Sequence, residues 1–154
     1  MSIEAKLAEL GLELPVAAAP VAAYLPYVEQ GSFLHISGQL PFDNGQVVTG
    51  RLGVNVDIVG GYDAARRCAL MLLAQIGNAL DGDFSRVEKI VKLGCFVNSA
   101  PDFTDQAKVA NGASELFESL FGDAGRHARA AVGVAVLPLG AAVEIDAIVA
   151  VRHA

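Results

Sequence analysis

The clearest hydrophobic pattern in the chain is helical. From Tyr62 to Leu80 the apolar residues recur every three or four positions, as they do along one face of a helix. A second helical stripe runs from Phe103 to Phe121, where Asp102 is the expected N-cap and Gly122 the expected end. The two stripes predict two amphipathic helices that each bury one face.

Five further segments alternate between apolar and polar residues, the pattern of a strand with one buried face: Val21–Val28, Phe33–Leu40, Val87–Val97, Arg129–Leu137 and Ala142–Val151. Gln30-Gly31-Ser32 separates the first two and is typical of a hairpin turn. The order of strands and helices predicts an α/β (α+β) fold, in which one mixed β-sheet carries two helices on one face. A length of 154 residues fits a single domain, 1–154.

Two other segments lack this periodicity. Ser2 can cap a short helix, Ile3–Leu10, and the prolines and alanines that follow it are typical of an extended arm. We therefore expect residues 1–20 to be an N-terminal helix and arm, peripheral to the core. Asp43–Gly61 is rich in glycine and polar residues, which predicts a long loop with a short strand near Val47.

One side of the predicted sheet lacks the Lys, Glu and Thr of a solvent-exposed face. In the strand after the second helix, four residues share that side: Arg129, Ala131, Gly133 and Ala135. In the last strand, Glu144 and Asp146 point away from the apolar residues between them. Because this face is small and apolar apart from a few charges, we infer that another subunit covers it.

Composition and the N-terminal sequence indicate the cellular compartment. Hydrophobic residues make up 53% of the chain, and the mean hydropathy is +0.45. No apolar run approaches the roughly 20 residues that cross a bilayer. Glu4, Lys6 and Glu9 interrupt the region where a secretory signal would be apolar, so we expect a cytoplasmic protein. In that compartment, Cys68 and Cys95 are expected to be reduced core residues.

The charge pattern argues against broad binding of RNA or DNA. The formal net charge is −6, and the basic residues are scattered. Only Arg126, His127 and Arg129 cluster, whereas a non-specific nucleic-acid binder usually shows a basic stripe.

Three ionisable residues, Arg129, Glu144 and Asp146, lie where charge is unexpected. Arg129 begins an apolar strand, and is either a surface charge near a strand end or a guanidinium fork that binds a carboxylate. Glu144 interrupts another strand, and is either an ion-pair partner or a residue that orients or deprotonates a water. A simple hairpin at Pro138–Ala141 would pair Arg129 near Ala150 and Glu144 near Ala135. Spacing alone therefore places them in no common site; a different strand order or a neighbouring subunit would be needed.

Four other residues are weaker candidates. Gly38 ends a strand where the absence of a side chain would let a ligand approach, although a plain turn or bulge explains it equally well. Asn111 lies beside the apolar stripe of the second helix and has packing as its other explanation. Tyr24 and Tyr27 flank a proline, and either can be a packing aromatic.

No metal or cofactor site is expected. His35, His127 and His153 lack the spacing of metal ligands. Gly50–Gly61 lacks the patterns of a phosphate-binding loop.

Three sequence blocks in order resemble a known family. Arg129–Ala147 reads R-A-A-V-G-V-A-V-L-P followed by V-E-I-D-A, which is an arginine, a valine-rich strand, a Leu-Pro break and an apolar-Glu-apolar triplet. Ile36–Pro41 reads I-S-G-Q-L-P, and Lys92–Asn98 with Asp102-Phe103 forms the third block. With these blocks, residues 21 to 152 resemble the Rid family of reactive intermediate deaminases, also called the YjgF family.

The resemblance implies a chorismate-mutase-like fold and a homotrimer with clefts between subunits. It also implies hydrolysis of enamine or imine intermediates, derived from amino acids, to a keto acid and ammonia. The carboxylate-binding arginine of the family falls on Arg129, and its water-positioning glutamate falls on Glu144. Its other substrate-binding positions fall on Tyr24, Gly38 and Asn111. A cleft between subunits would also bring the arginine and the glutamate together.

The chain departs from the family at two positions. Ala131 stands where the family's deaminases often carry a cysteine, and His127 stands where a proline is common. The arm and the Asp43–Gly61 loop also look longer than in compact members. The chain thus resembles a divergent subgroup that lacks the usual active-site cysteine, and its water would be held by Glu144 and backbone groups.

Three functions compete. The first is an enamine or imine hydrolase, and the second is a non-catalytic binder of small carboxylates such as 2-keto acids. The third is an endoribonuclease, an activity attributed to some family members, and the acidic net charge counts against it. The first two share Arg129 and differ over Glu144, which only a hydrolase needs.

Overall fold

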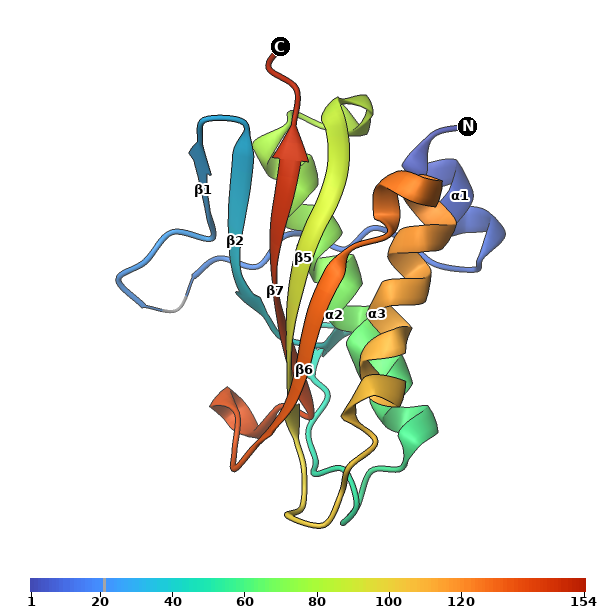
Figure 1. Cartoon of the computed structure of the whole chain (residues 1–154), viewed down its shortest axis with the longest axis vertical. Helices are drawn as coiled ribbons and strands as arrows, with labels where there is room; N and C mark the ends of the chain where they lie inside the picture. The colour runs from blue at the N-terminus through green and yellow to red at the C-terminus, as the bar shows by residue number, and fades with distance from the viewer. Residues whose placement is uncertain (21) are drawn as a thin grey trace.

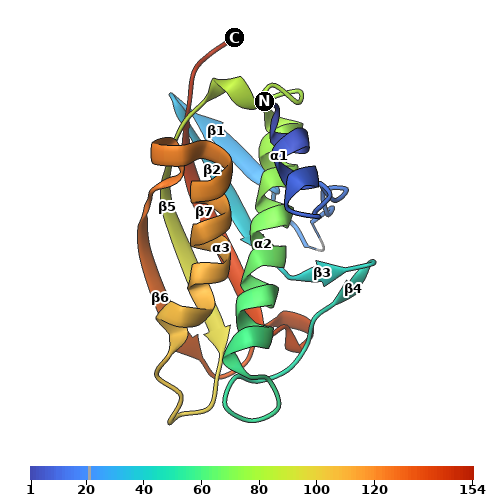
Figure 2. The ribbon, with the colours of Figure 1, turned by 90° about the vertical axis from the view of Figure 1, so that its right-hand side faces the viewer.

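The computed structural model describes residues 1–20 and 22–154, and its main sheet has five strands in the order β1-β2-β7-β5-β6. The strands are β1 (Tyr27–Gln30), β2 (Phe33–Gln39), β5 (Val87–Asn98), β6 (Ala128–Val134) and β7 (Val143–Val151). Two long helices, α2 (Ile58–Ala79) and α3 (Gln106–Phe121), pack side by side on one face (Figures 1 and 2). The predicted mixed sheet with two helices on one face is therefore confirmed.

Shorter elements connect this framework. They are α1 (Ile3–Glu9), the hairpin strands β3 (Phe42–Asp43) and β4 (Gln46–Val47), and the 3-10 turns η1 (Phe84–Arg86), η2 (Gly122–Gly125) and η3 (Pro138–Gly140). The β3-β4 hairpin lies inside the predicted loop and includes the expected short strand near Val47. None of the helices in residues 1–20 and 22–154 is both long and apolar enough to cross a membrane.

The core lies between the sheet and the two long helices. Cys68 and Leu72 on α2 and Phe117 on α3 are fully buried against the inward residues of β5 and β7. The helices approach so closely that a Cβ at Gly112 would overlap the backbone carbonyl of Tyr62. This glycine permits the contact between α2 and α3 and fixes the position of α3 over the sheet.

The last two strands do not form the predicted hairpin. β6 pairs in parallel with β5, to which α3 connects it, whereas β7 lies between β2 and β5 and is antiparallel to both. The chain leaves β6 at the sheet edge and crosses below β5 through η3 to reach the centre (Figure 1). A strand that follows a crossover helix commonly pairs in parallel with the strand before it, and this preference outweighs the short connection that suggested a hairpin.

The face assigned to Arg129 is also corrected. Its side chain hydrogen-bonds to α3, and Ala131 packs against the buried core. A Cβ at Gly133 would meet the side chains of Ser99 and Gln106 on the helix side. Arg129, Ala131 and Gly133 therefore point toward the helices, and the alternate residues of β6, such as Val132, face the open side of the sheet.

Three element boundaries differ from the prediction. The first strand begins at Tyr27, after the exposed residues 22–25, and Val21 lies outside the described residues. α2 begins at Ile58, one turn before the predicted start, because the Asp57 side chain accepts a hydrogen bond from the Gly60 amide at 2.8 Å. α3 begins at Gln106, so Asp102 is not its N-cap.

The N-terminal segment is not peripheral to the core. α1 forms as predicted, with Ser2 as its N-cap, and its inner face buries Ile3 and Leu7. Leu7 is 0% exposed and belongs to the main hydrophobic cluster. The Lys6 ammonium donates a hydrogen bond to the carbonyl of Leu120 at 2.6 Å, which ties α1 to the end of α3.

We predict that Leu7→Ala lowers the free energy of unfolding by about 2–5 kcal/mol, because it removes a buried leucine and leaves a cavity. Leu10→Ala is the matched control, since Leu10 is 48% exposed. Chemical denaturation of both variants measures the difference. Equal, small losses in the two variants would show that α1 contributes nothing to the core.

Candidate active site

Arg129 is held against α3 by three hydrogen bonds. Its Nη1 donates to Asn111 Oδ1 and to Ser114 Oγ, each at 2.9 Å, and its Nη2 donates to the carbonyl of Ala107 at 3.3 Å. All three acceptors lie on one face of the helix, at successive spacings of four and three residues. The structure thus brings together the two predicted residues Arg129 and Asn111, and adds Ser114, which the sequence analysis missed.

These contacts leave one edge of the guanidinium for a ligand. Both hydrogens of Nη1 are used by α3, and one hydrogen of Nη2 is used by the Ala107 carbonyl. Among the described residues, Nε–H and the second Nη2–H of Arg129 donate to no acceptor. The Nε–H lies on the side edge of the guanidinium, the edge whose shape matches the two oxygens of a carboxylate.

Glu144 lies on the open face of the sheet, over Gly38. A Cβ at Gly38 would stand 2.9 Å from both Cδ and Oε1 of Glu144, so the glycine makes room for the carboxylate. Within the described residues this carboxylate forms no hydrogen bond. Its burial, and the Asp146 charge on the same face of β7, raise the pKa of Glu144. A half-buried carboxylate in this state is a stronger proton acceptor than an exposed one.

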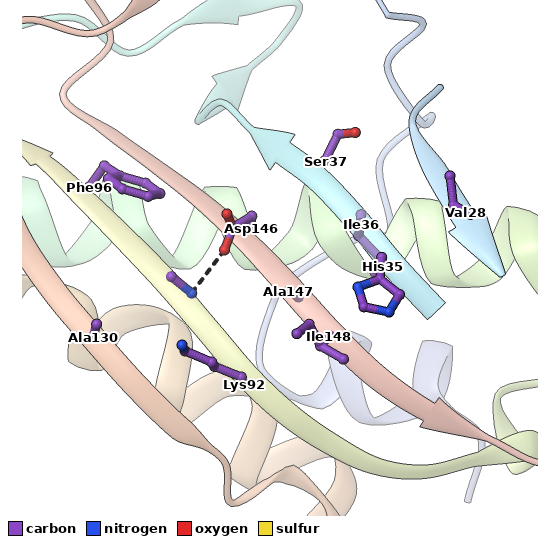
Figure 3. A pocket seen from close by; sticks show the side chains of 11 residues that line it. Val28, His35, Ile36, Ser37, Lys92, Phe96, Ala130, Asp146, Ala147 and Ile148 are labelled. Atoms are coloured by element: carbon purple, nitrogen blue, oxygen red, sulfur yellow. Dashed lines mark hydrogen bonds between the residues drawn. The ribbon is translucent and has the colours of Figure 1, made fainter. Parts of the chain in front are cut away.

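Asp146 contributes a second carboxylate to the open face, over Gly94. The Gly94 amide donates to Asp146 Oδ1 at 3.1 Å, and burial raises the pKa of Asp146 despite this hydrogen bond and the nearby Lys92 ammonium. The carboxylate borders a hollow of about 530 Å³ in the middle of the open face, which Figure 3 shows with His35 and Phe96 at its sides. The lining of this hollow combines polar side chains, those of Asp146, Lys92, His35 and Ser37, with apolar ones.

Tyr24 and Gly38 share a different, apolar hollow of about 220 Å³. Pro26, Leu40 and Leu139 complete its walls, and Tyr24 is 48% exposed. Tyr27 instead packs against the hydrophobic core from β1. Of the two tyrosines, Tyr24 is therefore the one that lines a hollow with Gly38.

Arg129 and Glu144 do not meet within one subunit. Arg129 is in register with Leu93 and Ala147, whereas Glu144 is in register with Phe96. A separation of three residues along the strands and two strands across corresponds to about 14 Å between Cα atoms. Their side chains also point to opposite faces of the sheet, so one small molecule cannot contact both in a single subunit.

The two cysteines offer no nucleophile. Cys68 is fully buried and Cys95 is 1% exposed. Burial raises the pKa of Cys95 to about 12 and that of Cys68 well above its ordinary value, so both remain thiols at neutral pH. Ala131 contributes no thiol beside Arg129 either, and the chemistry available at the site is that of a guanidinium, carboxylates and water.

Comparison with known families gives one match over nearly the whole chain. Residues 4–149 fit the family described as "YjgF/chorismate_mutase-like, putative endoribonuclease". Three relatives match this chain over most of their own lengths. Protein TCP17 of Trypanosoma cruzi is 54% identical over 98% of this chain and 95% of its own. A RutC family protein of Aquifex aeolicus is 32% identical, over 92% and 98%. A 2-iminobutanoate/2-iminopropanoate deaminase of Dermatophagoides farinae is 27% identical, over 92% and 95%.

Solved structures fall into two groups by similarity. Atu1372 of Agrobacterium tumefaciens, of unknown function, has a TM-score of 0.93 and 49% identity, over 97% of this chain and 92% of its own. A "putative endoribonuclease" of Shewanella oneidensis has a TM-score of 0.94 and 34% identity, over 98% and 100%. The Escherichia coli protein TdcF with bound serine is less similar, with a TM-score of 0.60 and 26% identity over 89% and 94%. The fold is therefore the expected chorismate-mutase-like α+β fold.

Proposed function

The chain belongs to the YjgF/RidA (RutC) family, and on that premise we propose that it hydrolyses imine and enamine intermediates of amino acids to 2-keto acids and ammonia. The observation that carries the proposal is the fixed guanidinium of Arg129, whose side edge is left for a carboxylate. An imine derived from an amino acid keeps the carboxylate that such an edge binds. Two relatives agree with this chemistry: one is an imine deaminase by name, and TdcF holds serine, which also has a carboxylate.

The reaction needs no oxidant and no cofactor. The oxygen of one water adds to the imine carbon, and the imine nitrogen takes up a proton to give a carbinolamine. The C–N bond then breaks, the nitrogen leaves as ammonia, and the carbon keeps the oxygen as a ketone. We assign Arg129 to the substrate carboxylate and Glu144 to the water, whose proton it accepts and passes to the leaving nitrogen.

This assignment requires a second subunit. The side chains of Arg129 and Glu144 point to opposite faces of the sheet, and their Cα atoms are about 14 Å apart. A complete site therefore forms only when the sheet edge that carries Arg129 in one subunit meets the open face of another. Large apolar residues on that face favour such a contact: Val28, Phe33, Phe96, Val132 and Ile148. Val28, Phe33 and Val132 are 45–47% exposed in the isolated chain. We therefore propose the homotrimer that is typical of the family.

Two other functions are weaker. A non-catalytic binder of small carboxylates would use Arg129 and leave Glu144 without a role, although Gly38 makes room for its carboxylate. An endoribonuclease must bind a polyanion, and the net charge of −6 opposes this. The only basic cluster that the sequence analysis found, at residues 126–129, lies beside two carboxylates that pair with Arg126, those of Glu118 and Asp123.

We predict that wild-type protein accelerates ammonia release from imines that an amino-acid oxidase generates in the assay. Arg129→Ala should lower kcat/KM about 30-fold or more, since losing one partner of a buried charged pair costs about 2–5 kcal/mol. Glu144→Gln should lower kcat about 100-fold or more and leave KM nearly unchanged, as expected for the loss of a general base. Arg66→Ala is the matched control, because Arg66 is a partly exposed arginine on α2 that forms a surface ion pair with Asp63.

The outcomes separate the candidate functions. If the wild type binds pyruvate and Arg129→Ala does not, but the wild type does not accelerate ammonia release, the protein is a binder and not a hydrolase. If Arg129→Ala is as active as Arg66→Ala, the carboxylate site lies elsewhere.

We predict a mass near three times the 16.0 kDa chain when light scattering is coupled to size exclusion. Val132→Lys should give smaller species, because it places a charge on the apolar open face. Val59→Lys is the control, since Val59 is 77% exposed at the start of α2, on the opposite side of the sheet. A wild-type mass near 16.0 kDa at micromolar concentration would contradict the intersubunit site.

A further inference from the structure

The hydrogen bonds around Arg129 continue beyond the guanidinium. Ser114 Oγ, which accepts from Arg129 Nη1, lies 2.8 Å from His127 Nε2. The other ring nitrogen, His127 Nδ1, lies 2.7 Å from the carbonyl oxygen of Gly125. These three contacts link the turn η2, the strand β6 and the helix α3 through one continuous chain of hydrogen bonds.

The direction of each hydrogen bond in this chain is determined by its ends. The Gly125 carbonyl can only accept, so His127 Nδ1 carries the proton and Nε2 of the neutral ring is an acceptor. The Ser114 hydroxyl must then donate to Nε2, which turns its lone pairs toward Arg129. Arg129 can only donate, and its Nη1 meets those lone pairs.

We propose that Ser114 and His127 are positioning residues, which hold the Arg129 guanidinium so that its Nε–Nη2 edge faces the substrate carboxylate. This role rests on the proposed function, and it gives a task to His127, one of the two positions at which the chain departs from the family pattern. Ser114, Arg129 and His127 line one hollow of about 240 Å³ at the sheet edge, which brings a ligand on the guanidinium close to the imidazole.

The surroundings of His127 keep the free imidazole neutral. Burial is the main cause that lowers its pKa, and the Arg129 and Lys89 charges act in the same direction. The Gly125 carbonyl and the Glu118 carboxylate oppose them. The ring of Phe117 packs edge-on against the imidazole, with centroids 6.2 Å apart, and Arg126 lines the same hollow while paired with Glu118 at 3.4 Å.

A carboxylate bound to Arg129 changes this balance. It offsets the guanidinium charge that disfavours the imidazolium, so the pKa of His127 rises on binding. Linkage is reciprocal, and the affinity for the carboxylate must then increase as the pH falls through the pKa of His127. A role in structure alone would leave both quantities unchanged.

The test uses pyruvate as the probe and the full-length protein. NMR titration of the imidazole resonances should give a His127 pKa below its ordinary value in the free protein and a higher value with saturating pyruvate. Calorimetry should show that wild-type affinity rises roughly fivefold or more between pH 7.5 and pH 5.5, the lower end of a typical coupling between two sites. Glu144→Gln should keep this rise, which separates the titration of His127 from that of Glu144.

Two substitutions at His127 isolate its role. His127→Gln places an acceptor near the position of Nε2, and we expect it to keep the affinity measured at pH 7.5 but to lose the rise toward pH 5.5. His127→Leu and Ser114→Ala each remove one member of the hydrogen-bond chain, and both should raise KM roughly tenfold while kcat changes little. Circular dichroism establishes that each variant is folded.

The proposal is overturned if His127→Leu binds pyruvate as well as His127→Gln does, or if pyruvate leaves the His127 pKa unchanged. Arg129-dependent hydrolysis that is insensitive to His127→Leu would refute the positioning role and leave the proposed function intact. Coupling between pyruvate and His127 without imine hydrolysis would refute the proposed function and leave the positioning role intact. A wild-type protein that binds no 2-keto acid would refute both.

Discussion

The parallel pairing of β6 with β5 at the sheet edge is the constraint on which the candidate site depends. It turns Arg129 toward α3, where Asn111 and Ser114 meet its Nη1, and it leaves the centre of the sheet to β7. Glu144 on β7 consequently faces the other side. Had the two strands formed a hairpin, the guanidinium would have no helix face to hold it.

The two halves of the site differ in charge and in burial, and therefore in the chemistry that each can perform. On the helix side, a guanidinium, a hydroxyl and a neutral imidazole form one continuous chain of hydrogen bonds, and the guanidinium keeps N–H groups for a ligand. On the open side, two half-buried carboxylates have raised pKa values. The first arrangement suits an anion that is held still, and the second suits proton transfer to and from water. A reaction that uses both needs the helix-side edge of one subunit beside the open face of the next.

The sequence predicted most of the fold because its periodicities are strong. The stripe at Tyr62–Leu80 and the alternation at Val143–Val151 correspond to buried faces of α2 and β7. Alternation shows which residues share a face but not which face the helices cover, and Arg129 was therefore assigned to the wrong side. The sequence does not show the bulge between Ile90 and Lys92 in β5 either. Regular alternation with Leu93 places Val91 on the inner face, but the bulge buries Ile90 and leaves Val91 only partly buried.

The residues of the site were harder to predict than the fold. Arg129 and Glu144 attracted attention as charges in apolar strands, and the family resemblance assigned their roles. Ser114 carries no such signal, although its position three residues after Asn111 places it on the same face of α3. His127 was noted as a member of a basic cluster and as a departure from the family pattern. Neither observation predicted its role, because the carbonyl and hydroxyl that orient its ring come from other elements.

The central claim is that Arg129 and Glu144 act in one site from different subunits, and mixed oligomers test it most directly. Arg129→Ala and Glu144→Gln proteins are each expected to be inactive, and co-assembly should restore activity in about a quarter of the clefts of a symmetric trimer. Co-assembly of Arg129→Ala with the double variant Arg129→Ala/Glu144→Gln should restore none. If mass spectrometry verifies mixed oligomers of the two single variants and they remain inactive, the two residues do not share an intersubunit site.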